Sequence, residues 1–161
     1  MIKGLFETHL YVENLQRSIH FYEQVLGLQP CYYEQERSAA FFWIGAPKQA
    51  MLGLWEKPKN EIDKRHFAFA CTVEDVLNKS IFFLQERGLQ PYNFLRDGTE
   101  RPMVFAWMPA IAIYFTDPDG HALEFIAVLE GDAKPEWGII SYEEWMARNQ
   151  QDIHTTPFTL L

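Results

Sequence analysis

The chain has 161 residues and is 48% hydrophobic, which is enough for one ordinary domain with a buried core. Its formal net charge is −8 at pH 7, and its lysines and arginines form no basic stripe. Nucleic acid and anionic membranes are therefore poor partner candidates, and a small-molecule ligand is favoured. No apolar run is long enough to span a membrane, and the N-terminus lacks a signal-peptide core, so we expect a cytoplasmic protein.

The first third of the chain predicts a strand, a helix and three further strands. Residues 5–12 alternate as a strand, with His9 on the face opposite to Leu10. Asn14 can cap a helix whose apolar residues recur at helical spacing and which ends at Gly27. Three strands are predicted next, at about residues 30–35, 39–44 and 50–56.

The second part of the chain repeats this order. The tetrapeptide Gly-Leu-Gln-Pro occurs at residues 27–30 and again at 88–91, each time after a helical pattern that follows a strand opening on a histidine, His9 or His66. The repeat predicts a duplicated module that closes one core. Its second copy has a helix at about 74–87 and strands at about 91–95, 110–116 and 121–128. The segment from Arg96 to Pro109 has no counterpart in the first copy and predicts a loop over a site.

The pattern changes after residue 128. Ser141 and Glu144 have the spacing of a capping box, which predicts a short helix to about Asn149 and a weakly ordered tail beyond it. We therefore predict a domain over residues 1–128, with modules at about 5–56 and 66–128. Residues 129–161 are predicted to form a C-terminal extension with a short helix.

Three residues at related places in the repeat could bind a metal. His9 and His66 open the first strand of each module, and Glu124 lies in the last strand of the second. Two imidazoles and one carboxylate form a recurring ligand set for a divalent transition metal. A lone histidine in a strand is more often structural than a ligand. Glu124 favours the metal site, because a carboxylate in an apolar strand is costly to bury unless it is paired or bound to a metal.

These residues resemble the vicinal oxygen chelate superfamily, which includes glyoxalase I, the fosfomycin-resistance thiol transferases, the extradiol dioxygenases and the bleomycin-resistance proteins. The resemblance covers about residues 5–128 and rests on His9, His66, the helix segment 18–22 and the segment 113–125, Ile-Tyr-Phe-Thr-Asp-Pro-Asp-Gly-His-Ala-Leu-Glu-Phe. It implies an α+β fold in which paired βαβββ modules form a curled mixed sheet around a metal-binding cup. It also implies a homodimer.

The resemblance assigns roles to several residues. His9, His66 and Glu124 match the family's metal ligands, and the metal is expected to be Mn, Fe, Zn, Ni or Co, with its identity open. Tyr114 is expected to act in catalysis, either by hydrogen-bonding the substrate oxygen or by holding the substrate in place. The residues expected to bind substrate are Trp43, Trp55 and Arg101, the two tryptophans because strand parity makes them candidates for a pocket wall.

Departures from the family pattern narrow the possible activities. Glyoxalase I has a fourth ligand, a Glu, where this chain has Gly53, so an open three-ligand metal is expected. The fosfomycin transferases share the tyrosine at Tyr114, but their phosphonate-contacting serine is Ala112 here. Only Arg96 and Arg101 in the insert are nearby candidates for binding a phosphonate. Most extradiol dioxygenases need a larger two-domain chain and an additional acid-base histidine.

The sequence therefore predicts a metalloenzyme that uses a divalent metal as a Lewis acid on a carbonyl, epoxide or enolate oxygen of a small substrate. Lyase or isomerase chemistry of the glyoxalase type and thiol transfer to an epoxide are the leading reactions, and a thiol cosubstrate is left open. Two alternatives remain. One is a metal-free, antibiotic-binding protein of the bleomycin-resistance type, and the other is a small extradiol-type dioxygenase.

Overall fold

The computed structural model describes residues 1–155 and divides into two compact units. The first unit comprises Met1–Phe67 and Thr116–Ala122, and the second comprises Ala68–Phe115 and the chain from Leu123 onward. The turn that joins two strands of the second sheet therefore belongs to the first unit. Among the described residues, no helix is long and apolar enough to cross a membrane.

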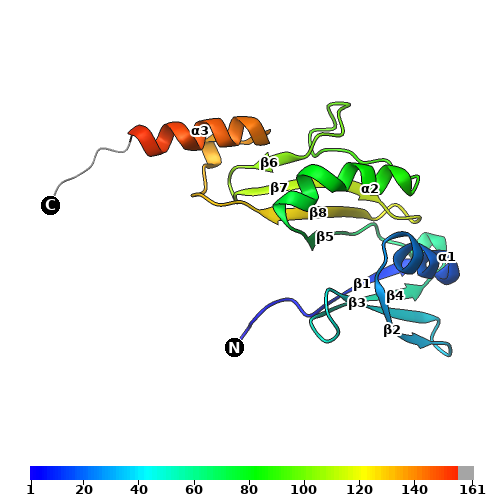
Figure 1. The fold of residues 1–161 in the computed structure, drawn as a ribbon. Helices are drawn as coiled ribbons and strands as arrows, with labels where there is room; N and C mark the ends of the chain where they lie inside the picture. Colours follow the sequence, from blue (N-terminus) through cyan, green and yellow to red (C-terminus); the bar gives the residue numbers. More distant parts are fainter. Residues whose placement is uncertain (156–161) are drawn as a thin grey trace. The chain divides into compact units, whose positions relative to one another are not determined.

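The first unit is a four-stranded sheet with one helix (Figure 1). Its elements are β1 (Glu7–Val12), α1 (Leu15–His20) with a π-helical continuation (Phe21–Val25), β2 (Gln29–Glu34), β3 (Ala39–Ile44) and β4 (Ala50–Glu56). The strand order is β1-β4-β3-β2, with β1 parallel to β4 and the remaining pairs antiparallel. All four strands and the helix are confirmed close to their predicted positions. The Asn14 side chain accepts a hydrogen bond from the Arg17 backbone N–H, as a helix cap does.

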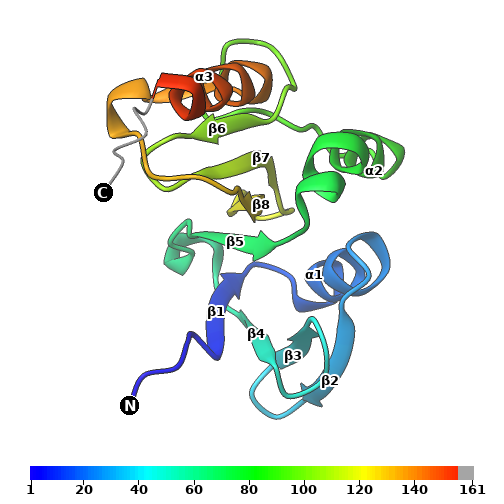
Figure 2. The ribbon, with the colours of Figure 1, turned by 60° about the vertical axis from the view of Figure 1, so that its left-hand side comes forward.

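Alternation along these strands separates a covered face from an open one. Leu10, Phe42 and Leu54 are fully buried on the face that α1 covers (Figure 2). The next residues along the strands project to the opposite face, because successive side chains of a strand point to opposite sides. His9 and Trp55 lie on that open face.

The second unit repeats this strand order and extends it. Its elements are β5 (His66–Ala70), a π-helical turn (Asp75–Lys79) leading into α2 (Ser80–Glu86), β6 (Met103–Phe105), β7 (Ala110–Thr116), β8 (Ala122–Val128), β9 (Ile139–Ser141) and α3 (Tyr142–Thr155). The sheet order is β5-β8-β7-β6-β9, so the first four strands match β1-β4-β3-β2. The predicted α+β fold of paired βαβββ modules with mixed sheets is confirmed.

One predicted strand of the second module is wrong. Residues 91–95 form no extended strand: Tyr92 alone pairs with Tyr114, through two backbone hydrogen bonds of 2.9 Å. The buried Asn93 side chain donates to Asp97 and Thr99, so the chain turns instead of continuing as a strand. The fourth strand is β6, which lies inside the segment predicted to be a loop.

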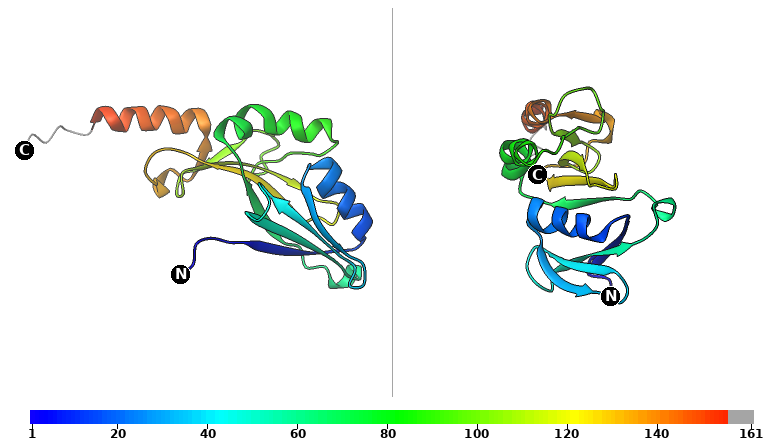
Figure 3. Two further views of the ribbon diagram at one scale, coloured as in Figure 1. Left: turned by 60° about the horizontal axis from the view of Figure 1, so that its bottom comes forward. Right: turned by 90° about the vertical axis from the view of Figure 1, so that its right-hand side faces the viewer.

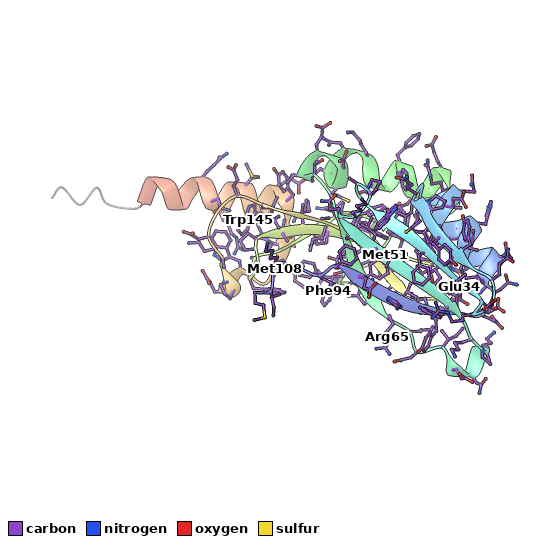
Figure 4. All side chains as sticks on the ribbon, turned by 90° about the horizontal axis from the view of Figure 1, so that it is seen from below. Glu34, Met51, Arg65, Phe94, Met108 and Trp145 are labelled. Atoms are coloured by element: carbon purple, nitrogen blue, oxygen red, sulfur yellow. The ribbon has the colours of Figure 1, made fainter. Side chains whose placement is uncertain are left out.

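The C-terminal extension is part of the second unit. β9 pairs antiparallel with β6, and Trp145 of α3, only 1% exposed, packs in the helix-side core of the sheet (Figure 4). The Ser141 hydroxyl accepts from the Glu144 N–H at 3.1 Å, which confirms the predicted cap. The helix continues to Thr155, past the predicted end at Asn149, and projects beyond the sheet (Figure 3). The rest of the predicted tail, residues 156–161, lies outside the described residues.

The turn between β7 and β8 is fixed to the start of α1 by Asp119. Its carboxylate accepts hydrogen bonds from the Glu13 backbone N–H, the Arg17 guanidinium and the Ser18 hydroxyl. The side chain is only 2% exposed, so these donors replace the water that the carboxylate loses on folding.

His121 fixes the same turn from its other end. The side chain is fully buried, its Nδ1 accepts from the Arg65 backbone N–H at 3.0 Å, and its Nε2 lies 2.8 Å from the Tyr11 carbonyl oxygen. Nε2 must therefore donate, which sets the tautomer. Nearby, the Tyr22 hydroxyl donates to the Asp117 carboxylate at 2.9 Å. These contacts give His121 a structural role in the first unit.

Replacing Asp119 with alanine is expected to lower the free energy of unfolding by about 2–3 kcal/mol, because it removes a buried charged acceptor of three hydrogen bonds. Chemical denaturation measures the change. Asp63→Ala is the matched control, since Asp63 also pairs with an arginine, Arg65, but its side chain is 71% exposed. That control is expected to cost at most about 0.5 kcal/mol. Equal losses in the two variants would contradict the role given to Asp119.

Candidate functional site

The open face of the first sheet places His9 directly opposite Gly53. The two residues are partners in the parallel pairing of β1 with β4, and the imidazole lies over the glycine. A Cβ atom at position 53 would lie 3.2 Å from His9 Nδ1 and 3.3 Å from its Cε1, closer than ordinary van der Waals contact. The absence of a side chain at Gly53 therefore makes room for this ring position.

His9 is held by two neighbours on the same face. The Trp55 indole N–H donates to His9 Nδ1 at 2.7 Å, and the two rings are nearly parallel, at 16°. On the other side, His9 Nε2 lies 3.5 Å from a carboxylate oxygen of Glu7. Glu7 lies two residues before His9 on β1, and Trp55 lies two residues after Gly53 on β4. The pairing register therefore places both side chains on the face of His9, one on each side of it. Sequence analysis missed Glu7, although strand parity places it on the face of His9.

Aromatic rings continue this face. Phe41 lies edge-on to Trp55, at 5.7 Å between ring centroids, and Tyr32 stacks on Phe41 at 6.5 Å. The Arg37 guanidinium lies 5.3 Å above the Trp55 ring. Trp43, the other predicted pocket-wall tryptophan, lies two residues from Phe41 on β3 and is half-buried. The structure thus places Trp55 against His9 and Trp43 farther along the same face.

Glu124 and Tyr114 form a polar pair on the second sheet. Glu124 on β8 is only 3% exposed, and Tyr114 on β7 is 9% exposed. Burial raises the pKa of the Tyr114 hydroxyl, and the charge of Glu124 and a hydrogen bond to its carboxylate raise that pKa further. The phenol therefore stays protonated near neutral pH and remains a hydrogen-bond donor.

A stack of side chains extends from Tyr114 to a cation. The Tyr92 ring stacks on Tyr114 with 5.7 Å between centroids, and the Arg96 guanidinium lies 4.1 Å above Tyr92. Arg96 has a φ of 49°, in the left-handed region that few non-glycine residues adopt. The predicted substrate residue Arg101 is exposed instead. Its charge contributes to lowering the pKa of the Asp97 and Glu143 carboxyl groups, after the hydrogen bonds that these groups accept. Arg96 is therefore the insert arginine that the structure places in the stack with Tyr114.

His66 lies at the start of β5. Its Nδ1 is 3.0 Å from the Ala122 carbonyl oxygen, an acceptor, so Nδ1 carries the proton and the lone pair is on Nε2. Metal-binding histidines typically donate their other ring N–H to a carbonyl or carboxylate in this way. Ala68 and Ala70 follow on the same strand face and are exposed, so only small side chains flank His66 there.

The predicted ligands are divided between the units, with His9 and His66 in the first and Glu124 in the second. Within residues 1–155, no group of three or more His, Cys, Asp or Glu side chains could hold a metal ion. Two of the three nonetheless have surroundings that suit a metal: the tautomer of His66 leaves a lone pair on Nε2, and Glu124 is a buried carboxylate in an apolar strand. Both ring nitrogens of His9 face protein groups, Trp55 at Nδ1 and Glu7 at Nε2.

Residues 4–125 match the family described as the Glyoxalase/Bleomycin resistance protein/Dioxygenase superfamily. The chain belongs to this superfamily. The resemblance to vicinal oxygen chelate proteins is thereby confirmed over most of the chain. The match ends inside β8, so β9 and α3 lie beyond the matched residues.

Relatives in the superfamily include metallothiol transferases. FosB of Lysinibacillus sphaericus (strain C3-41), a metallothiol transferase, is 31% identical over 115 residues, which cover 71% of this chain and 74% of that protein. The integron cassette protein HFX_CASS4, from the mobile metagenome of the Halifax Harbour sewage outfall, is 31% identical, with a TM-score of 0.66 and coverage of 79% of this chain and 100% of that one. The fosfomycin resistance protein FosX from Listeria monocytogenes, complexed with Mn(II) and sulfate, shares the fold at 23% identity, with a TM-score of 0.59 and coverage of 80% and 93%.

Replacing Tyr114 with phenylalanine is expected to lower the free energy of unfolding of the metal-free protein by about 1–3 kcal/mol, because the buried Glu124 carboxylate loses a hydrogen-bond donor. Denaturant titration in the presence of a chelator measures this change. Tyr92→Phe is the matched control: it also removes a hydroxyl, from the ring stacked on Tyr114, and is expected to cost about 0.5 kcal/mol or less. If Tyr114→Phe leaves the free energy of unfolding unchanged, the importance of this hydrogen bond is refuted.

Proposed function

We propose that this superfamily member is a metal-dependent enzyme that acts on a small oxygen-bearing substrate, with His9, His66 and Glu124 as the metal ligands. The observation that carries the proposal is the Glu124 carboxylate, which is 3% exposed in an apolar strand and hydrogen-bonded by Tyr114. A buried carboxylate with a positioned donor is typical of functional sites, where a fixed charge is worth its desolvation cost. His66, with its lone pair on Nε2, supplies a second ligand of the kind that divalent transition metals prefer.

A bound divalent metal would supply Lewis-acid chemistry at a substrate oxygen. Gly53 contributes no side chain beside His9, so the first sheet offers no fourth protein ligand there. Tyr114 keeps its proton, since burial and Glu124 raise its pKa, and the hydroxyl would have to turn away from Glu124 to donate to a substrate oxygen that gains negative charge. The aromatic side chains of Phe41 and Trp55 would shield the substrate from water, as an apolar pocket wall does.

Thiol transfer to an epoxide is the reaction we favour. The curated relatives include FosB metallothiol transferases from Lysinibacillus and Staphylococcus. Arg96, in the stack with Tyr92 and Tyr114, is placed to attract an anionic substrate group, although Ala112 lacks the hydroxyl that fosfomycin transferases use. Lyase or isomerase chemistry on a thiol adduct is the second candidate, because it needs the same metal and the same donor. A small dioxygenase and a metal-free binding protein remain the alternatives that the experiments separate.

Metal analysis tests the ligand set. Equilibrium dialysis against Mn(II), Fe(II), Co(II), Ni(II) or Zn(II), followed by elemental analysis, is expected to give about one ion per chain with at least one of them. His66→Ala and Glu124→Gln are each expected to weaken binding roughly tenfold or more. His20→Ala, at an exposed histidine of α1, is the control and should bind normally. If no ion binds, the enzyme proposal fails and the binding-protein alternative gains support.

The metal-loaded protein is then assayed with fosfomycin and several thiols, with methylglyoxal–thiol adducts, and with catechols under oxygen. Turnover that needs both a thiol and an epoxide supports thiol transfer. Turnover of the adducts alone favours the lyase reaction, and oxygen uptake with catechols favours the dioxygenase.

We also propose a homodimer, as the resemblance implies. Light scattering at micromolar concentration is expected to give twice the chain mass of 18.9 kDa. A monomeric mass across that concentration range would refute this part of the proposal.

A further inference from the structure

The hydrogen bond between Trp55 and His9 determines which nitrogen of His9 carries its proton. An indole N–H can only donate, so His9 Nδ1 must present its lone pair to Trp55 at 2.7 Å. A neutral imidazole has one N–H and one lone pair, and the proton of His9 therefore lies on Nε2. The Glu7 carboxylate, 3.5 Å from Nε2, favours the same arrangement.

With the proton on Nε2 and the Nδ1 lone pair occupied by the Trp55 N–H, His9 offers no lone pair to a metal while this bond persists. An ion at Nδ1 must displace the Trp55 N–H. An ion at Nε2 requires the proton to move to Nδ1, where it would face the indole N–H, so that two donors would oppose each other. Either route breaks the Trp55–His9 bond before His9 can act as a ligand.

We propose that Trp55 is a positioning residue whose hydrogen bond occupies the one lone pair of neutral His9, so that metal loading requires this bond to open. The inference rests on the proposed function in one respect, the assignment of His9 as a ligand. The tautomer itself follows from the geometry of the first unit alone. In this arrangement, Trp55 lowers the metal affinity of the site and makes loading depend on movement of one side-chain pair.

The surrounding residues keep the bond closed. Gly53 lets the imidazole lie close to β4, since a Cβ there would come within 3.2 Å of Nδ1 and 3.1 Å of Phe41 Cε1. Phe41 contacts the indole edge-on, and the Arg37 guanidinium lies over the indole ring, 5.3 Å from its centroid. The indole is therefore held by packing on a strand, where side chains are better fixed than on a loop. The glycine that removes a fourth ligand position also permits the contact that restrains His9.

Trp55→Phe tests the proposal, because it keeps an aromatic ring and removes only the N–H. Competition of the whole protein with a chromophoric chelator for Zn(II) and for Mn(II) is expected to show about threefold to tenfold tighter binding, which is the value of one hydrogen bond expressed as a ratio of affinities. Trp107→Phe is the matched control, at a half-exposed tryptophan of the second unit, and should leave the affinity unchanged. Unchanged or weaker binding by Trp55→Phe would overturn the proposal.

A second measurement needs no metal. Side-chain ¹⁵N NMR of the metal-free wild type, with His9 assigned by comparison with His9→Ala, is expected to show Nε2 protonated and Nδ1 as an acceptor, and the Nδ1 signal should move in Trp55→Phe. A wild type with Nδ1 protonated would overturn the proposal. The two proposals can fail separately: a wild type that binds no metal refutes the proposed function, whereas one that binds metal no more weakly than Trp55→Phe refutes only the restraint by Trp55.

Discussion

The alternation of side chains in two sheets of the same strand order is the constraint on which the rest of the molecule depends. In each unit one sheet face is covered by a helix and filled with aliphatic side chains, such as Leu10 in the first and Ile113 in the second. Every second residue is thereby committed to the other face. His9 and Glu124 lie next to buried leucines in their strands, so neither can move to the helix side without a one-residue slip that would expose the core. The positions of these polar residues are thus set by packing on the opposite face.

The same constraint explains what could be predicted from the sequence. The alternating strands, the first helix and the face of His9 followed from periodicity, because each involves five or more residues with a regular pattern. β6 did not, since it has only three residues, all apolar and buried, and the repeat pointed to residues 91–95, which continue from Gly-Leu-Gln-Pro as β2 does in the first module. Residues 91–95 do not form a strand because the Asn93 side chain closes a local turn with Asp97 and Thr99. The Trp55–His9 bond was beyond prediction for another reason: it depends on a ring position permitted by Gly53, and periodicity carries no information on rotamers.

The segment that gave the most specific resemblance is mostly structural in this chain. In the turn from Asp117 to His121, the polar side chains of Asp119 and His121 bind α1, β1 and the backbone before β5. Only Tyr114 and Glu124, at the two ends of the segment, pair with each other on the second sheet. A motif can therefore identify a superfamily through residues that hold a turn, while the residues proposed to act in chemistry lie on the strands that flank it.

The strand β9 gives the C-terminal extension a role in protecting the sheet. β6 is hydrogen-bonded to β7 on one side and to β9 on the other, and Ile140 and Trp145 cover the core residues Val104 and Ile111. A chain ending where the superfamily match ends would leave β6 with a row of unpaired backbone groups, an edge on which other chains can pair and aggregate. In this chain, the segment after β8 thus closes the edge of a three-residue strand that is too short to protect itself.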